Sequence, residues 1–354
     1  NMRRLISFCA LALLCAAPAL GAELAVPGLD QVWEEAEGYG VDRESSLDQG
    51  LSRLWADALG QLGALLRTSL ATAVKLMAVV LLCSLAEGAR QGEGDGLQAV
   101  NLAGVLAITA LTMTDMAVMI GLGRDTLDRM QGFSSVLLPV VAVLTAAAGG
   151  VTGAAVRQGA TVLFSQLLIT AMDRLLVPLV YAFVAVSCAQ AAVGNPGLKK
   201  VADLIRNTVT FLLTALLLAF VGYLTASGAI AGSVDAAAVK AAKLAISRAI
   251  PVVGGILADA SESVLAGAGA LKGTVGAAGL VVVLAICLTP FLRLALQYLV
   301  YKGAAALCAT VAQPKLSGLI DAIGSAFGLV LGMTGAGALV LLVSLVSAMK
   351  AVVP

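Results

Sequence analysis

The chain has 354 residues, of which 60% are hydrophobic and only 12% are charged, and its mean hydropathy is +0.99. Soluble domains carry about 25% charged residues, so this composition excludes an ordinary water-soluble globule. Disordered chains are poor in apolar residues and are excluded as well. The chain has no histidine, which removes histidine-based triads, histidine-ligated zinc or haem sites and histidine proton relays.

Residues 1–22 are predicted to be a signal peptide. Arg3 and Arg4 precede an apolar stretch that ends near Ala17, and Pro18 and small residues follow. Cleavage and retention of this leader both stay open. In either case we expect the next residues to lie outside the cytoplasm.

Residues 23–60 form an acidic segment, which we expect to be extracytoplasmic. They contain nine acidic and two basic residues, whereas the later residues contain 18 basic and 12 acidic ones. This distribution argues against binding of nucleic acid. The spacing of the leucines and of Trp55 predicts two short helices around Gly38 and Gly40, resting on the membrane surface or on a partner.

Residues 61–354 are predicted to form a polytopic helical membrane domain, because apolar runs long enough to span a bilayer recur along them. The expected spans are 68–86, 97–122, 133–148, 159–193, 207–230, 274–300 and 316–349. The 159–193 stretch is too long for one crossing and carries Pro178, so it is either two short spans or one long kinked helix. The predicted fold class is all-α, with about seven transmembrane helices and a range of six to eight.

Two stretches are predicted to be interfacial helices. Gly123–Gln131 carries opposite charges four residues apart, and residues 231–273 are rich in alanine, glycine and charge. The basic residues Lys199, Lys200 and Arg206 favour a cytoplasmic loop.

Three glycines at four-residue spacing, Gly324, Gly328 and Gly332, predict close approach of a neighbouring helix. That neighbour can belong to the same chain or to a second copy. A homo-oligomer therefore stays open, and the lipid bilayer is an expected partner in either case.

Charged residues inside the apolar runs are the candidate functional residues, because an intramembrane charge is expensive. The candidates are Asp115, Asp173, Arg174 and Arg293, while Lys75 and Asp321 can reach an interface by snorkelling. The alternative interpretation is an internal ion pair. We expect no catalytic, cofactor-binding or metal-binding residue: Lys272 precedes Gly273, which breaks the phosphate-loop order, and the six cysteines form no paired motif.

The plan of the chain resembles the stage III sporulation protein AE family. The resemblance includes the leader, the acidic segment with Trp33 and a series of stretches in matching order. These stretches are Phe133–Pro139, Ala148–Gly150, Leu198–Asn207, Ala249–Gly254, Asp259–Val264 and Lys272–Gly276.

The resemblance implies a non-enzymatic membrane component of a secretion-like channel complex that joins the mother cell to the forespore. The implied partners are the other stage III sporulation A-operon proteins and, through them, the forespore protein Q. The implied location is the outer forespore membrane on the mother-cell side, and the implied role is support of forespore development and late forespore gene expression. The alternative is a stand-alone secondary transporter or permease, which broken helices near charges would suit.

Overall fold

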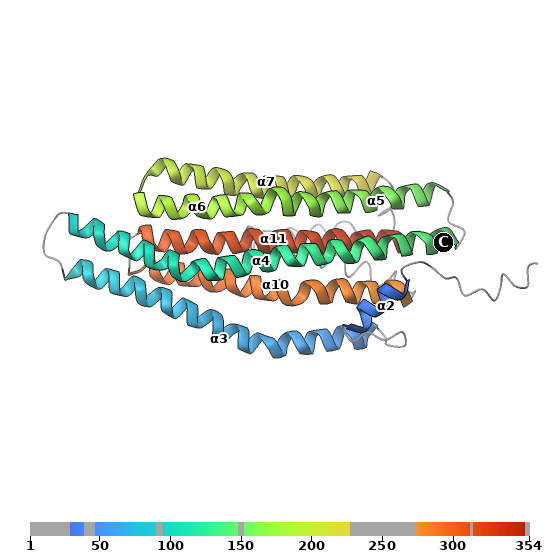
Figure 1. The fold of residues 1–354 in the computed structure, drawn as a ribbon, viewed down its shortest axis with the longest axis horizontal. Helices are drawn as coiled ribbons and strands as arrows, with labels where there is room; N and C mark the ends of the chain where they lie inside the picture. The colour runs from blue at the N-terminus through green and yellow to red at the C-terminus, as the bar shows by residue number, and fades with distance from the viewer. Residues whose placement is uncertain are drawn as a thin grey trace, which may run out of the picture.

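The computed structural model describes residues 29–38, 47–89, 95–147, 152–226, 274–311 and 314–350. These residues are helical apart from short turns and include no strand. Their long helices run side by side in one bundle (Figure 1). The predicted all-α class is therefore confirmed. The leader at 1–22 and the expected interfacial helices at 231–273 lie outside the described residues.

The elements follow one another as helices joined by short connections. In chain order they are α2 (Leu29–Gly38), α3 (Leu47–Gly88), α4 (Asp95–Ala147), α5 (Thr152–Ala171), the π-helical turn η2 (Met172–Leu176), α6 (Val177–Val193), α7 (Pro196–Ala226), α10 (Thr274–Cys308) and α11 (Pro314–Lys350). In the described part of the chain, six helical segments are long and apolar enough to cross a membrane. Six is the lower end of the predicted range.

The helix α4 merges two predicted spans, which corrects the expectation for residues 97–148. It continues for 53 residues through Gly123–Gln131, where an interfacial helix was predicted. The reason is that Gly123, Leu127 and Met130 are buried on one face while the charged residues between them are exposed. Pro139 is exposed and does not end the helix, since membrane helices tolerate the loss of one backbone hydrogen bond.

The 159–193 stretch forms one helical path with an irregular turn, so the second of its two predicted alternatives is correct. The Val177 N–H bonds to the Met172 carbonyl, which gives the wide turn η2. Pro178 follows directly and has no N–H to donate to the Arg174 carbonyl. The wide turn thus lies where the regular hydrogen-bond pattern is interrupted, as is usual for such irregularities.

The helix α11 is the centre of the bundle. In its most apolar window 94% of the residues are buried, against 17% in the corresponding window of α3. Its neighbours are α10, α4, α6, α5 and α7. Small residues permit this enclosure: a Cβ atom at Gly123 of α4 would overlap the Val330 Cγ1, and one at Gly337 would lie 2.9 Å from the Leu127 Cδ2. The Ser165 and Ser344 hydroxyls, both buried, are hydrogen-bonded at 2.7 Å.

The N-terminal acidic segment is packed on the bundle rather than separate from it. In α2, Val32, Trp33 and Ala36 are buried, and the helix contacts α10 and α4. A helix lies on either side of Gly38 and Gly40, as the spacing predicts, but the second is α3, which has 42 residues and is not short. α3 crosses residue 60 without interruption.

The two ends of the bundle differ. At one end of the bundle α3, α6 and α10 end and α4, α7 and α11 begin, whereas α2 lies at the other end (Figure 1); the first of these is called the turn end below. The α6–α7 turn is tight: Gly194 ends α6 with a left-handed backbone (φ 74°), and the Asn195 side chain accepts a hydrogen bond from the Gly197 N–H at 2.8 Å. Exposed Lys199, Lys200 and Lys315 lie at this turn end.

Candidate functional site

Three small polar clusters between helices of the described bundle include charged side chains. One joins α3, α4 and α10, a second joins α10 and α11, and a third joins α4 and η2. Each cluster contains one acidic residue that lies in a predicted apolar run. Asp115 and Asp173 are candidate site residues, and Asp321 is a charge that was expected to snorkel. The clusters are separate, and no single site gathers the predicted charges.

The first cluster surrounds Asp115 of α4, whose side chain is only partly exposed. The Tyr301 hydroxyl donates to Asp115 Oδ2 at 2.9 Å, and the Gln297 Nε2 donates to the same oxygen at 3.1 Å. The Ser69 hydroxyl donates to the Gln297 Oε1 at 2.8 Å, which directs the amide nitrogen toward Asp115. Gln297, Tyr301 and Ser69 are all buried, so three helices share a continuous polar chain.

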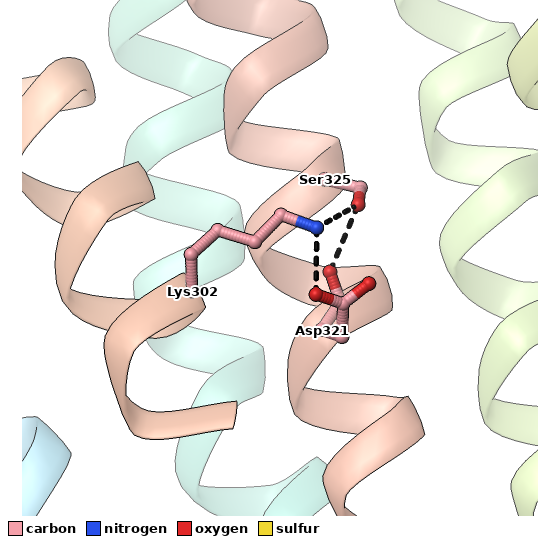
Figure 2. A network of polar contacts seen from close by, with 3 residues as sticks. All are labelled: Lys302, Asp321 and Ser325. Carbon is pink, nitrogen blue, oxygen red and sulfur yellow. Dashed lines mark hydrogen bonds and ion pairs between the residues drawn. The ribbon is translucent and has the colours of Figure 1, made fainter. Parts of the chain in front are cut away.

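The second cluster is an ion pair with a hydroxyl bridge, shown in Figure 2. The Lys302 ammonium lies 2.7 Å from Asp321 Oδ1 and donates to the Ser325 hydroxyl oxygen at 2.8 Å. The Ser325 hydroxyl donates in turn to the Asp321 backbone carbonyl at 2.9 Å. The Lys302 and Asp321 side chains are 29% and 49% exposed. Asp321 is therefore paired across the α10–α11 contact and not simply directed to an interface.

The third cluster pairs Arg124 of α4 with Asp173 in the irregular turn η2. The Arg124 Nε lies 2.8 Å from the Asp173 Oδ1 in ion-pair contact without hydrogen-bond geometry. The Asp173 side chain is 13% exposed and that of Arg124 is 58% exposed. Arg124 and Asp128 lie four residues apart on α4, but the ion pair of Arg124 is with Asp173 in a neighbouring segment. Irregular turns of this kind occur often at functional sites in helices.

The remaining predicted charges, Arg174 and Arg293, are exposed on the bundle surface, as is Lys75. Arg174 follows Asp173 directly but faces away from the Arg124 pair. These exposed side chains belong to none of the three clusters. Any role for them as site residues stays a prediction.

The predicted glycine stripe lies on α11 where this helix meets α10. A Cβ atom at Gly324 would lie 3.1 Å from the Tyr301 Cβ, and one at Gly328 would lie 2.9 Å from the Tyr298 Cε2. Gly332 is buried on the same helix. The neighbouring helix at Gly324 and Gly328 is thus part of the same chain. The energetic importance of the stripe stays a prediction.

Five residues of these clusters were missed by sequence reasoning: Ser69, Gln297, Tyr301, Lys302 and Ser325. The signal for two of them was present, since Gln297 and Lys302 are the strongly polar residues that follow Arg293 in an apolar run. Ser69, Tyr301 and Ser325 gave no signal, because serine and tyrosine are common in membrane helices and only their partners make them distinctive.

The three clusters pair polar side chains across contacts between helices. Within the described ranges, no three cysteine or acidic side chains gather in a group that could hold a metal ion. The four described cysteines, Cys83, Cys188, Cys287 and Cys308, are free thiols. What the clusters can do chemically is to hold neighbouring helices in register.

Comparison with known proteins gives a family and one curated relative. A family model described as stage III sporulation protein AE matches residues 45–351. The stage III sporulation protein AE of Bacillus subtilis (strain 168) is 25% identical over 202 residues, which cover 57% of this chain and 51% of that protein. The chain therefore spans about half the length of this curated relative. No solved structure matches the chain.

The Lys302–Asp321 pair is expected to act as a unit. Lys302→Met and Asp321→Asn should each destabilise the chain in detergent, because each leaves an unpaired charge beside an apolar helix. The double variant should recover part of that loss, with a coupling free energy above about 1 kcal/mol, the upper limit for exposed pairs. Thermal unfolding of the four proteins measures it. Lys315→Met, which removes an exposed lysine of α11, is the control and should have little effect. Additivity within about 0.3 kcal/mol would contradict the prediction.

Proposed function

Because the chain belongs to the stage III sporulation protein AE family, we propose that it is a non-enzymatic component of a channel complex between the mother cell and the forespore. A sporulation role and a multi-pass membrane character follow from the family and from the six candidate spans. The proposal adds the complex, the location in the outer forespore membrane and the support of forespore development and late forespore gene expression.

The observation that carries the proposal is the extent of the family match. It covers residues 45–351 and so includes all six candidate spans. The family match therefore falls on the membrane bundle of this chain. A match to a helical membrane bundle suits a role within the envelope.

The filled centre of the bundle favours a role as one subunit of a complex over a role as a stand-alone permease. The helix α11 occupies the middle, and every residue from Ile323 to Leu342 is buried there. A conduit through one copy would have to displace this apolar helix from α4 and α10. A passage formed between copies of the chain, or between the chain and other subunits, requires no such displacement.

The outer surface offers area for lipid and for neighbouring subunits. α3 exposes a row of large apolar side chains, including Leu59, Leu66, Leu70, Val74 and Leu82. Such a surface is compatible with acyl chains and with apolar helices of a partner. The proposed partners are the other stage III sporulation A-operon proteins and, through them, the forespore protein Q.

The charges at the two ends favour one orientation of the chain. Basic residues at the turn end, such as Lys199 and Lys200, favour the cytoplasm. The acidic residues of α2 and of the first turns of α3, such as Asp30 and Asp57, lie at the opposite end. We therefore place residues 23–60 outside the mother-cell cytoplasm, between the two membranes.

The orientation is testable with single cysteines in a cysteine-free background. Asp57→Cys should react with an impermeant maleimide in intact protoplasts of an expressing bacterium, because it is exposed at the proposed outer end. Lys199→Cys, exposed at the turn end, is the matched control and should react only after lysis. The reverse pattern would contradict the orientation.

Assembly is tested by affinity purification of the tagged chain from sporulating cells in mild detergent. We expect other A-operon proteins to be recovered with it, and we expect deletion of the gene to stop development after engulfment with late forespore expression lost. A tagged polytopic protein unrelated to sporulation controls for nonspecific recovery. Recovery of the chain alone, together with normal sporulation of the deletion strain and transport by the purified chain in liposomes, would favour the permease instead.

A further inference from the structure

The Asp115 carboxylate differs from the other two predicted acids in having only neutral partners. Asp173 faces an arginine and Asp321 faces a lysine. Asp115 receives hydrogen bonds from the Tyr301 hydroxyl and the Gln297 amide. Among the described residues, no basic side chain is paired with it.

The charged groups on the helices packed against α4 are engaged elsewhere or exposed. Lys302 is held by Asp321, and Arg124 is held by Asp173. The remaining described charges on these helices and on α4 itself are exposed, except that Glu87 is partly exposed. They are Asp30, Glu34 and Glu37 of α2, Arg53, Asp57, Arg67, Lys75 and Glu87 of α3, Asp125, Asp128 and Arg129 of α4, Arg174 of η2, Arg293 of α10 and Lys315 of α11. Tyr301 is the titratable neighbour that touches Asp115.

An ionised carboxylate in an apolar bundle needs a compensating cation, since two neutral hydrogen bonds repay only part of its lost hydration. An alkali or divalent cation would require several oxygen ligands at once. Here the Gln297 amide turns its nitrogen, and not its oxygen, toward the carboxylate, and the Tyr301 hydroxyl donates to it. A proton requires only one carboxylate oxygen.

We propose that Asp115 is a proton-binding site at the junction of α3, α4 and α10. Binding forms one O–H bond on a carboxylate oxygen and breaks none in the chain; the proton comes from water and returns to it. The inference does not depend on the proposed channel complex, because the purified chain alone can test it.

Protonation changes the contacts between helices and not only the charge. With the carboxylate ionised, Tyr301 and Gln297 both donate to Asp115 Oδ2. A protonated Asp115 needs an acceptor for its new O–H, and the Tyr301 hydroxyl oxygen is the nearest candidate because a hydroxyl can both donate and accept. The donor in the α4–α10 contact therefore reverses, while the Ser69–Gln297 bond is retained.

The test uses the full chain purified in detergent and the apolar reagent dicyclohexylcarbodiimide. A protonated carboxyl adds its O–H across the reagent's C=N bond, and the adduct rearranges to a stable N-acylurea without a leaving group. Peptide mass mapping should find this adduct on Asp115, with a rate that falls as the pH rises and does not respond to sodium. Asp115→Asn should abolish it, and Asp125→Asn, which changes an exposed acid of the same helix, should leave it unchanged.

Tyr301→Phe keeps the buried ring and removes the donor to the carboxylate. The variant removes a charge-assisted hydrogen bond from the ionised form and only a neutral hydrogen bond from the protonated form, so the protonated form is favoured. The midpoint of labelling should therefore move up, by less than about one pH unit. This variant tests the site even if Asp115→Asn folds poorly. Equal labelling of Asp115 and Asp125, protection by sodium in place of high pH, or no shift in Tyr301→Phe would each overturn the proposal.

Discussion

The burial of the central part of α11, from Ile323 to Leu342, is the constraint on which the rest of the structure depends. A helix surrounded by other helices in a bilayer gains no hydrophobic energy from those contacts, because lipid chains are as apolar as its neighbours. It must instead gain dispersion energy from close contact between helices, which requires small side chains where the helices meet. Gly123 of α4 and Gly337 of α11 allow close contact between these two helices, and Gly324 and Gly328 of α11 allow close contact with α10. These four glycines therefore have a packing role, whereas others, such as Gly121 and Gly222, have no atom within 4 Å of an added Cβ.

The placement of polar groups follows from the same constraint. The central window of α11 carries serine and threonine whose hydroxyls bond to its own carbonyls, as Thr334 and Ser344 do, and it carries no charge. The charged clusters lie outside this window: where α10 meets α3 and α4, where α4 meets η2, and near the N-terminal end of α11 beside α10. A movement of α3 against α10 would break the Ser69–Gln297 hydrogen bond of the Asp115 cluster while leaving the contacts of α10 and α4 with α11 in place.

The helical class and the range of spans could be predicted from the sequence, because apolar runs of sufficient length are a direct consequence of bilayer thickness. The continuity of α4 could not. The charges near Arg124, considered alone, indicate a helix at the membrane–water interface. The buried face that includes Leu127 and Met130 can be recognised only when the packing of α4 on α11 is known.

The sequence allowed the charged candidate residues to be identified, but not the residues that they contact. Asp115, Asp173 and Asp321 are conspicuous in apolar runs. Their partners lie far away in the chain: Asp115 and Tyr301 are separated by 186 positions. Spacing within a helix cannot identify such contacts, as the Arg124–Asp173 pair shows. The glycine spacing alone also could not identify α10 as the helix that contacts Gly324 and Gly328.

The most direct measurement compares the stability of Gly328→Leu and Gly318→Leu in the same detergent. Both variants add the same side chain to α11, but a Cβ atom at Gly328 meets the Tyr298 ring, whereas nothing lies within 4 Å of one at exposed Gly318. If enclosure of α11 holds the bundle together, Gly328→Leu should lower the free energy of unfolding by about 1–3 kcal/mol and Gly318→Leu should change it little. Equal stability of the two variants would contradict the account.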